Sequence, residues 1–183
     1  MTRVLVSGAS GIVGYGILRC LRKARPSCFL VGTSIYDDSV APAFCDVFEH
    51  APPTNAPDYL DWLLATLRRH QIDLLIPGIE ADMYHWVEQV PVIRATGALP
   101  LLNAPELISA CKDKWWFYQR LAAINMSCAI ASSLDMDFGV LKKKFGLPFL
   151  LKPRRGFGAK GIVRITSEEL FEQHRGDIGS LLM

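Results

Sequence analysis

Two glycine-rich segments of this sequence have the residue types and spacing that could hold a phosphorylated ligand. The first, VLVSGASGIVG at residues 4–14, is a short apolar run followed by three glycines. The second, KPRRGFGAKG at residues 152–161, has three glycines among four cationic side chains. Glycines let backbone N–H groups approach phosphate oxygens closely, while Lys and Arg neutralise the phosphate charge.

The second segment joins two β-rich runs, PFLLKP and GIVRIT, and it is longer than a simple hairpin turn requires. Its backbone amides could surround a polyphosphate, and its cationic side chains would add positive charge beside them. The residues concerned are Arg155, Gly156, Gly158, Lys160 and Gly161. A solvated surface loop is the alternative interpretation.

Lys152 lies at the end of the first of these runs, between Leu151 and Pro153. Because an unpaired ammonium is costly beside an apolar surface, we expect Lys152 to have a fixed anionic partner. The alternative is a lysine at a strand end whose long stem reaches water.

These motifs resemble those of the ATP-grasp enzymes, in particular proteins similar to the large subunit of carbamoyl-phosphate synthase and to biotin carboxylase. The resemblance covers essentially the whole chain and rests on CKDKWWFYQRLAAINM followed by FGLPFLLKPRRGFGAKGIVRI. It implies that Lys114, in the DK pair, and Lys152 bind the nucleotide phosphates. It also implies a mobile loop that closes over the β- and γ-phosphates, made by Arg155, Gly156, Gly158, Lys160 and Gly161.

The same resemblance implies an ATP-dependent carboxylate–amine ligase that uses ATP with Mg²⁺ and forms an acyl phosphate from small-molecule substrates. Family members carry their magnesium ligands beyond the position of Met183, so no metal ligand is expected within this chain. We therefore expect these 183 residues to be the N-terminal portion of a longer protein, inactive alone. A nucleotide-binding module without catalysis is an alternative, and a homodimer is left open.

The opening glycine segment has a competing interpretation as the NAD(P)-binding turn of a Rossmann oxidoreductase or epimerase. Two features disfavour it: no Tyr is followed by Lys four residues later, and Asp37 and Asp38 come after the position of a ribose-binding acid. We expect these glycines instead to let the first helix pack close to the sheet. Gly11, at the start of that helix, is then either unused or faces the acceptor substrate.

Glu80 and Asp82 are further substrate candidates, because they follow an apolar run that ends at Pro77 and Gly78. Ligands of open α/β sheets bind beyond the carboxyl ends of the strands. A helix with a solvated acidic first turn explains the two carboxylates equally well.

The elements that must position these residues follow from the hydrophobic pattern. Residues 1–105 alternate between β-rich runs and amphipathic helices, which predicts an α/β, Rossmann-like pre-ATP-grasp domain with a parallel sheet. In the first helix, Val13, Ile17, Leu18 and Leu21 share one face. Residues 106–183 are expected to form a partial α+β ATP-grasp subdomain, opening with one helix of about four turns over 104–126.

Composition limits the remaining classes. Half of the residues are hydrophobic, which is enough for a real core, and the net charge of +2 is too small to gather nucleic acid or an anionic membrane surface. The five cysteines form no C-x-x-C pair, and no run is long and apolar enough to span a bilayer. We therefore expect a cytoplasmic protein with neither nucleic-acid nor membrane partners.

Overall fold

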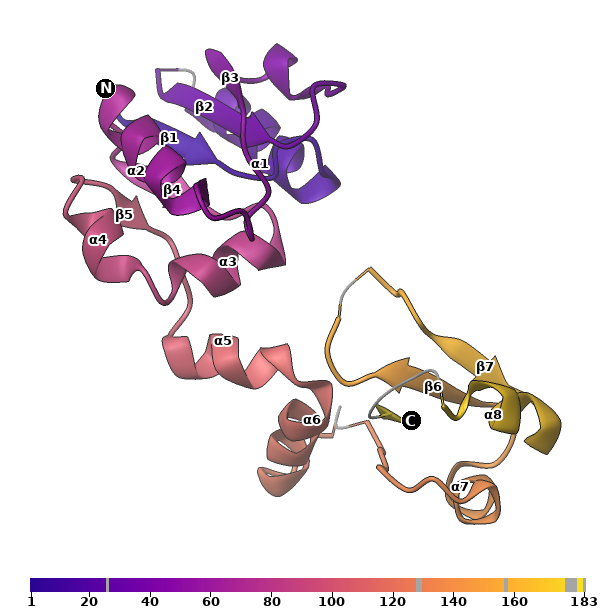
Figure 1. Cartoon of the computed structure of the whole chain (residues 1–183). Helices are drawn as coiled ribbons and strands as arrows, with labels where there is room; N and C mark the ends of the chain where they lie inside the picture. The colour runs from indigo at the N-terminus through magenta and orange to yellow at the C-terminus, as the bar shows by residue number, and fades with distance from the viewer. Residues whose placement is uncertain (26, 128–129, 157, 177–180, 183) are drawn as a thin grey trace. The chain divides into compact units, whose positions relative to one another are not determined.

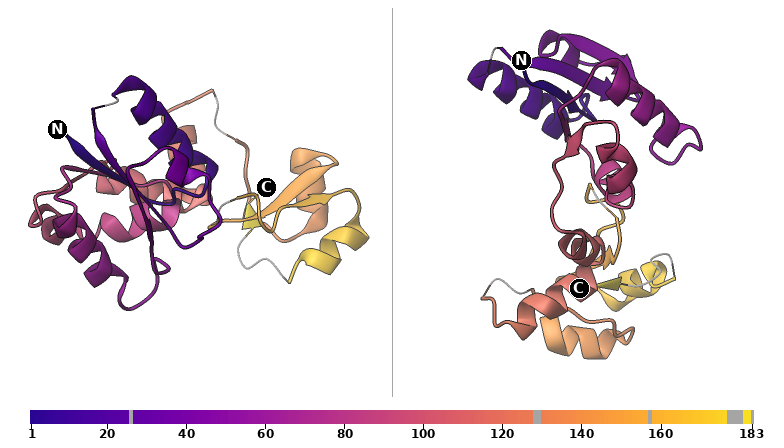
Figure 2. Two further views of the ribbon diagram at one scale, coloured as in Figure 1. Left: turned by 90° about the horizontal axis from the view of Figure 1, so that it is seen from above. Right: turned by 90° about the vertical axis from the view of Figure 1, so that its left-hand side faces the viewer.

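A computed structural model describes residues 1–25, 27–127, 130–156, 158–176 and 181–182 of the chain. The chain divides into two compact units, Met1–Pro105 and Glu106–Met183. Figures 1 and 2 show both units, and each is described by itself.

The first unit is built on a five-stranded sheet in the order β3-β2-β1-β4-β5, and every neighbouring pair is parallel. Successive parallel strands need crossover connections, and helices supply them here (Figure 1). The strands are β1 (Arg3–Val6), β2 (Phe29–Ser34), β3 (Val47–His50), β4 (Leu74–Ile76) and β5 (Leu99–Pro100). The helices are α1 (Ile12–Ala24), the short 3₁₀ helix η1 (Ala41–Ala43), α2 (Tyr59–Arg69), α3 (Glu80–Trp86) and α4 (Val90–Arg94).

Alternate side chains of β1 divide the core of the first unit between the two faces of the sheet. Val4 and Val6 pack in one cluster with Leu18 of α1, whereas Leu5 packs in another with residues of α2, α3 and α4. Because a strand presents successive side chains to opposite faces, this division places helices on both sides of the sheet. The predicted doubly wound, Rossmann-like sheet is confirmed.

One detail of the first helix differs from the prediction. Val13 is 57% exposed, whereas Gly14 and Leu18 are the buried residues of α1. The face toward the sheet therefore runs through Gly14, where the helix comes too close to the preceding turn to leave room for a side chain.

The second unit carries a three-stranded antiparallel sheet in the order β7-β6-β8, with helices before and between its strands. Its core is a cluster of buried aromatic and aliphatic side chains: Phe138, Leu141, Phe149, Leu151, Ile165 and Phe171. The helices are α5 (Pro105–Lys112), α6 (Lys114–Ala123), α7 (Phe138–Phe145) and α8 (Glu168–His174). The strands are β6 (Phe149–Pro153), β7 (Val163–Ile165) and β8 (Leu181–Leu182).

The prediction of one continuous helix over 104–126 is wrong, because the chain breaks at Asp113 into α5 and α6. Asp113 has an extended backbone, with φ −119° and ψ 107°, and its side chain accepts hydrogen bonds from the first turn of α6. An Asp side chain competes in this way with continuation of a helix. Two apolar residues of α5 are not buried either: Leu107 is 47% exposed and Cys111 is exposed.

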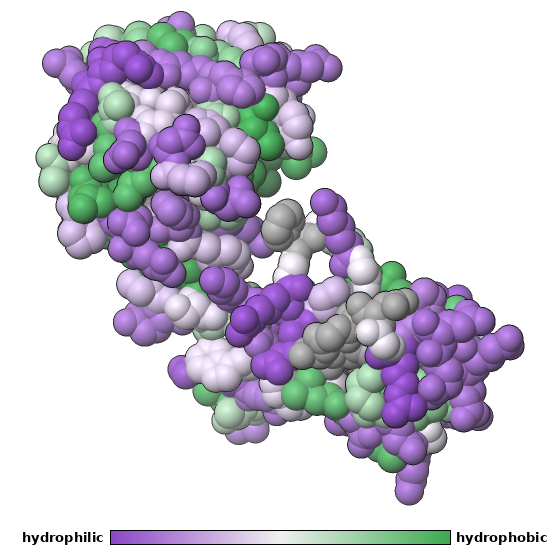
Figure 3. Space-filling model, in the orientation of Figure 1, coloured by the Kyte–Doolittle hydropathy of each residue, from purple (hydrophilic) through white to green (hydrophobic). Residues whose placement is uncertain are grey.

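On the face shown in Figure 3, hydrophilic residues dominate and hydrophobic residues form small separate groups. Within the described part of the chain, no helix is long and apolar enough to cross a membrane.

Candidate phosphate-binding site

The candidate site starts where α6 begins. Asp113 is the N-cap residue: its Oδ1 accepts hydrogen bonds from the backbone N–H groups of Trp115 (3.0 Å) and Trp116 (3.4 Å). A side-chain oxygen at this position satisfies backbone donors that have no partner within the helix. Lys114 of the DK pair is therefore held as the first residue of a capped helix.

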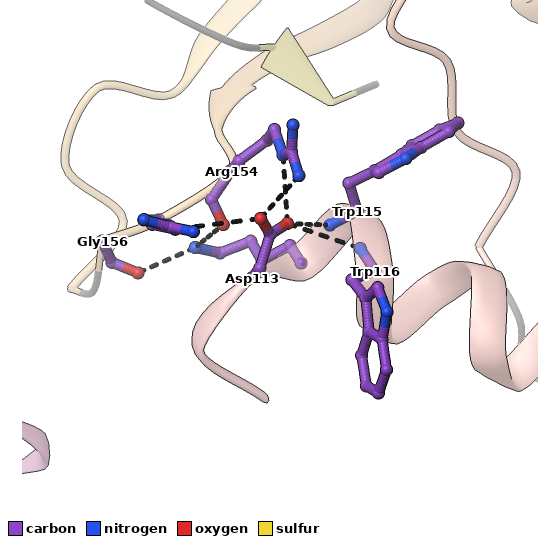
Figure 4. Close-up of polar contacts among 7 residues, drawn as sticks. Asp113, Trp115, Trp116, Arg154 and Gly156 are labelled. Carbon is purple, nitrogen blue, oxygen red and sulfur yellow. Dashed lines mark hydrogen bonds and ion pairs between the residues drawn. The ribbon is translucent and has the colours of Figure 1, made fainter. Parts of the chain in front are cut away.

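The same carboxylate binds the residue that follows β6, as Figure 4 shows. Arg154 donates from Nε to Oδ1 of Asp113 (3.1 Å) and from Nη2 to Oδ2 (2.6 Å), and Nε of Arg155 lies 3.8 Å from Oδ2. The backbone N–H of Lys114 donates to the carbonyl oxygen of Arg154 (3.0 Å). The start of α6 and the start of the glycine loop, residues 154–161, are thus joined by side-chain and backbone bonds.

Asp113 is ionised in this arrangement. The hydrogen bond from Arg154 lowers the pKa of the carboxyl below its ordinary value, and bonds from the Trp116 and Trp115 N–H groups lower it further. Burial acts in the opposite direction, since the side chain is only 13% exposed, but the pKa shift remains downward.

The side chain of Lys114 turns toward the glycine loop. Its Nζ donates to the carbonyl oxygen of Gly156 (2.8 Å) and lies 3.5 Å from that of Arg154. One turn further along the same face of α6, the hydroxyl of Tyr118 accepts a hydrogen bond from Nζ of Lys152 (3.1 Å). One face of α6 therefore contacts both the strand lysine and the loop.

The anionic partner expected for Lys152 is not what the structure shows. Among the described residues, its hydrogen-bond partner is the neutral Tyr118 hydroxyl, and its ammonium also lies 5.1 Å from the centre of the Tyr118 ring. An aromatic face and a phenol stabilise a cation without neutralising it. The charge of Lys152 remains available to an anionic ligand.

The glycine loop has a backbone that L side chains rarely adopt. Gly156, Gly158 and Gly161 have φ values of +127°, +66° and +73°, and Ala159 is also left-handed at +57°. A Cβ added at Gly156 or Gly158 would meet open space, whereas one at Gly161 would lie 3.0 Å from a ring carbon of Pro153. The left-handed backbone thus favours glycine along the loop, although Ala159 adopts it too, and close packing against Pro153 favours glycine again at the loop's end.

The charges of this set are strongly unequal. Five cationic side chains stand against a single carboxylate, that of Asp113; the cations are Lys114, Lys152, Arg154, Arg155 and Lys160. Arg154 is engaged by Asp113, whereas the Arg155 side chain is 73% exposed and Lys160 is exposed. Phe157, within the loop, lies outside the described residues.

The substrate candidates Gly11, Glu80 and Asp82 all belong to the first unit. Gly11 is the exposed N-cap residue of α1, and Glu80 is exposed at the start of α3. Asp82 is only 3% exposed, and its Oδ1 accepts hydrogen bonds from Thr54 Oγ1 (2.6 Å) and from the Tyr59 hydroxyl (2.7 Å). The structure thus gives Asp82 a buried partner, Tyr59 of α2, and a half-buried one, Thr54 of the preceding loop.

Tyr59 is the centre of this buried network. Its hydroxyl also accepts a hydrogen bond from Nε1 of Trp86 (3.0 Å), and both side chains are buried. Burial and the neighbouring Asp82 carboxylate raise the pKa of Tyr59, so the phenol stays protonated and donates to Asp82.

The opening glycines serve close packing, as predicted. A Cβ at Gly14 would lie 2.4 Å from the carbonyl oxygen of Gly8, and one at Gly78 would lie 2.1 Å from that of Ser7. Gly8 has φ +57°, and its missing side chain leaves room for Ile79. The turn after β1 and the turn after β4 therefore fit against each other because Gly8 leaves room for the Ile79 side chain and Gly78 leaves room for the Ser7 carbonyl.

Three residues of the site escaped sequence reasoning as site residues: Asp113, Tyr118 and Arg154. The Lys114–Tyr118 spacing of four residues was a usable signal for a shared helix face. The pairing of Asp113 with Arg154, which are 41 residues apart, had no local signal. Within the described residues, no group of three His, Cys, Asp or Glu side chains could hold a metal ion.

Comparisons with protein-family models and with curated proteins found no match. Solved structures do match. N5-carboxyaminoimidazole synthetase from Staphylococcus aureus aligns at 16% identity with a TM-score of 0.70, over 99% of this chain and 46% of that one. The biotin carboxylase domain of Hydrogenobacter thermophilus 2-oxoglutarate carboxylase aligns at 18% identity with a TM-score of 0.68, over 99% of this chain and 43% of that one. The chain shares the fold of one part of these structures, which are ATP-grasp enzymes.

A third ATP-grasp structure, the L-amino acid ligase from Bacillus licheniformis, aligns at 10% identity with a TM-score of 0.65, over all of this chain and 43% of that one. The chain thus spans less than half the length of these ATP-grasp structures. The biotin carboxylase domain is described as a dimer in complex with MgADP, ADP and bicarbonate. These three are not carbamoyl-phosphate synthases, so that finer resemblance stays a prediction.

Proposed function

We propose that this chain supplies the phosphate-binding part of an ATP-dependent ligase of the ATP-grasp type, one that joins a small carboxylate to an amine. The proposal rests above all on the convergence of Lys114, Lys152 and the glycine loop around one helix face. Lys114 and Tyr118, one turn apart on α6, contact Gly156 and Lys152 respectively. The fold shared with ATP-grasp enzymes supports the same assignment.

The side chains present fit a polyphosphate. Lys114 and Lys152 have only neutral partners among the described residues, so an anion gains a full electrostatic attraction from each. A phosphate oxygen would replace the Gly156 carbonyl oxygen as the hydrogen-bond acceptor of Lys114 Nζ. The neutral carbonyl is a weaker acceptor than the charged phosphate. The left-handed loop then contributes backbone N–H groups and the cations Arg155 and Lys160.

The work of these residues is positioning and charge neutralisation, which is what phosphoryl transfer mainly requires of a protein. When bound, ATP would supply the phosphoryl group that activates a carboxylate for attack by an amine, and Lys114, Lys152 and the glycine loop would hold its phosphates. A closed glycine loop keeps water from the activated carboxylate.

Magnesium does not fit this part of the site by itself. The one carboxylate, Asp113, is engaged by Arg154, and hard oxygen ligands are otherwise lacking in the set described above. We therefore assign Mg²⁺ to the nucleotide phosphates and to residues outside this set. The homodimer left open from the sequence stays a prediction, and the dimer of the biotin carboxylase domain supports it.

A thermal-shift experiment on the chain tests the proposal. MgATP and MgADP should raise the melting temperature, whereas NADH and NADPH should leave it unchanged, because a ligand stabilises only the fold that binds it. Lys152→Ala should abolish the nucleotide effect. Lys143→Ala, which removes an exposed lysine of α7, is the matched control and should retain it. Stabilisation by the dinucleotides alone would refute the proposal.

A further inference from the structure

A single carboxylate, that of Asp113, contacts two chain segments that lie 41 residues apart. On one side it caps α6 through the N–H groups of Trp115 and Trp116, and on the other it binds both Nε and Nη2 of Arg154. We infer that Asp113 is a positioning residue, which holds the start of α6 and the start of the glycine loop as one piece. This inference rests on the proposed nucleotide site and assigns it a residue beyond the lysines and glycines.

The geometry of the pair favours rigidity over simple charge neutralisation. Arg154 presents a planar fork whose two bonds reach different oxygens of the same carboxylate, which fixes orientation as well as distance. The Asp113 side chain is 13% exposed and that of Arg154 is 30% exposed, so solvent screens the pair less than an ion pair on the open surface. The Arg154 carbonyl oxygen, placed by this fork, accepts the backbone N–H of Lys114.

The loop beyond Arg154 is weakly held by its own packing. Gly156 and Gly158 are exposed, and a Cβ added at either would meet none of the described atoms within 4 Å apart from those of its own chain neighbours. The described contacts between the loop and α6 are all near the loop's start. Asp113 contacts Arg154 and Arg155, and Lys114 contacts Arg154 and Gly156. Asp113 also offsets the repulsion among the cations gathered here. Without the charge of Asp113, the loop and Lys114 should no longer hold fixed positions relative to each other.

A helix cap alone would explain half of these contacts, and one substitution separates the two roles. Asp113→Asn keeps a side-chain oxygen that caps α6 about as well as Asp does, but it removes the charge and one of the two acceptors for Arg154. Asp137→Asn is the matched control, because Asp137 caps α7 by the same kind of bond to Val140 N. Arg154→Lys keeps the charge and loses the fork, and its control is Arg175→Lys in the exposed pair with Glu172.

The first measurement is hydrogen–deuterium exchange of the chain without nucleotide. Asp113→Asn and Arg154→Lys should both speed exchange of the Lys114 N–H about tenfold, because its acceptor is the Arg154 carbonyl. Asp137→Asn and Arg175→Lys should leave that exchange unchanged. Unchanged exchange in Asp113→Asn would show that Asp113 is only a helix cap and would overturn the inference.

The second measurement is the dissociation constant of MgATP for the same five proteins. Asp113→Asn and Arg154→Lys should raise it about tenfold, or about 1.4 kcal/mol, and the two controls should stay near the wild-type value. A faster-exchanging Asp113→Asn that binds MgATP as tightly as wild type would overturn the positioning role. If wild type itself does not bind MgATP, the proposed function fails, while the exchange data still decide whether Asp113 joins α6 to the loop.

Discussion

Replacing Tyr59 with Phe tests whether Asp82, in the first turn of α3, belongs to the core of the first unit. The Tyr59 hydroxyl donates to Asp82 (2.7 Å) and accepts from Trp86 (3.0 Å), and Trp86 is fully buried. Tyr59→Phe removes one oxygen and leaves the indole N–H without an acceptor, while Thr54 still donates to Asp82. A buried donor left unsatisfied costs about 1–3 kcal/mol, so we expect a loss of about 2 kcal/mol in the free energy of unfolding.

Urea unfolding followed by near-ultraviolet circular dichroism, to which buried Trp86 contributes, measures this loss. With a slope of about 2 kcal/mol per molar urea, the midpoint should fall by about 1 M. Tyr36→Phe is the control, because the Tyr36 side chain is exposed and should leave the midpoint unchanged. Equal midpoints for Tyr59→Phe and wild type would refute the assignment of Asp82 and Tyr59 to a structural network.

Two further predictions concern the first helix and the acid range. Gly14→Ala should destabilise the first unit by about 2 kcal/mol, because the added Cβ would lie 2.4 Å from the Gly8 carbonyl oxygen. Gly16→Ala, whose Cβ would meet open space, should stabilise α1 by up to about 1 kcal/mol. The urea midpoint should therefore fall in the first variant and rise in the second. Arg154 lowers the pKa of Asp113 in the folded state, so the ionised Asp113 contributes to the free energy of unfolding. This contribution is complete above the unfolded pKa of about 3.9 and is lost as pH falls below that value. Acid titration of stability should therefore be flatter in Asp113→Asn, and an identical acid slope would contradict the ion pair.

Much of the first unit could be predicted from its sequence because its signals are local. Buried β runs alternate with amphipathic helices there, and that alternation requires parallel strands with crossovers. Leu63 and Leu67 of α2, which lie at the four-residue spacing of one helix face, are both buried. After β4 the chain forms two short helices, α3 and α4, and Pro91 stands in the first turn of the second one.

The candidate site was predicted less completely, for two physical reasons. A helical stripe over 104–126 is a weak signal beside an Asp that can cap a new helix, so the break at Asp113 was missed. The partners of Lys152 and Asp113 come from segments more than thirty residues away, and periodicity carries no information on such pairs. Lys152 was recognised as a charge that needs an explanation, but its neutral partner Tyr118 emerged only from the fold.

Calorimetric titration of the chain with MgATP tests most directly whether Lys152 and the glycine loop bind nucleotide phosphates. We expect a single site on the wild-type chain, loss of binding in Lys152→Ala, and retention in Lys143→Ala. Absence of heat with MgATP in the wild type, or equal affinity in Lys152→Ala, would contradict it.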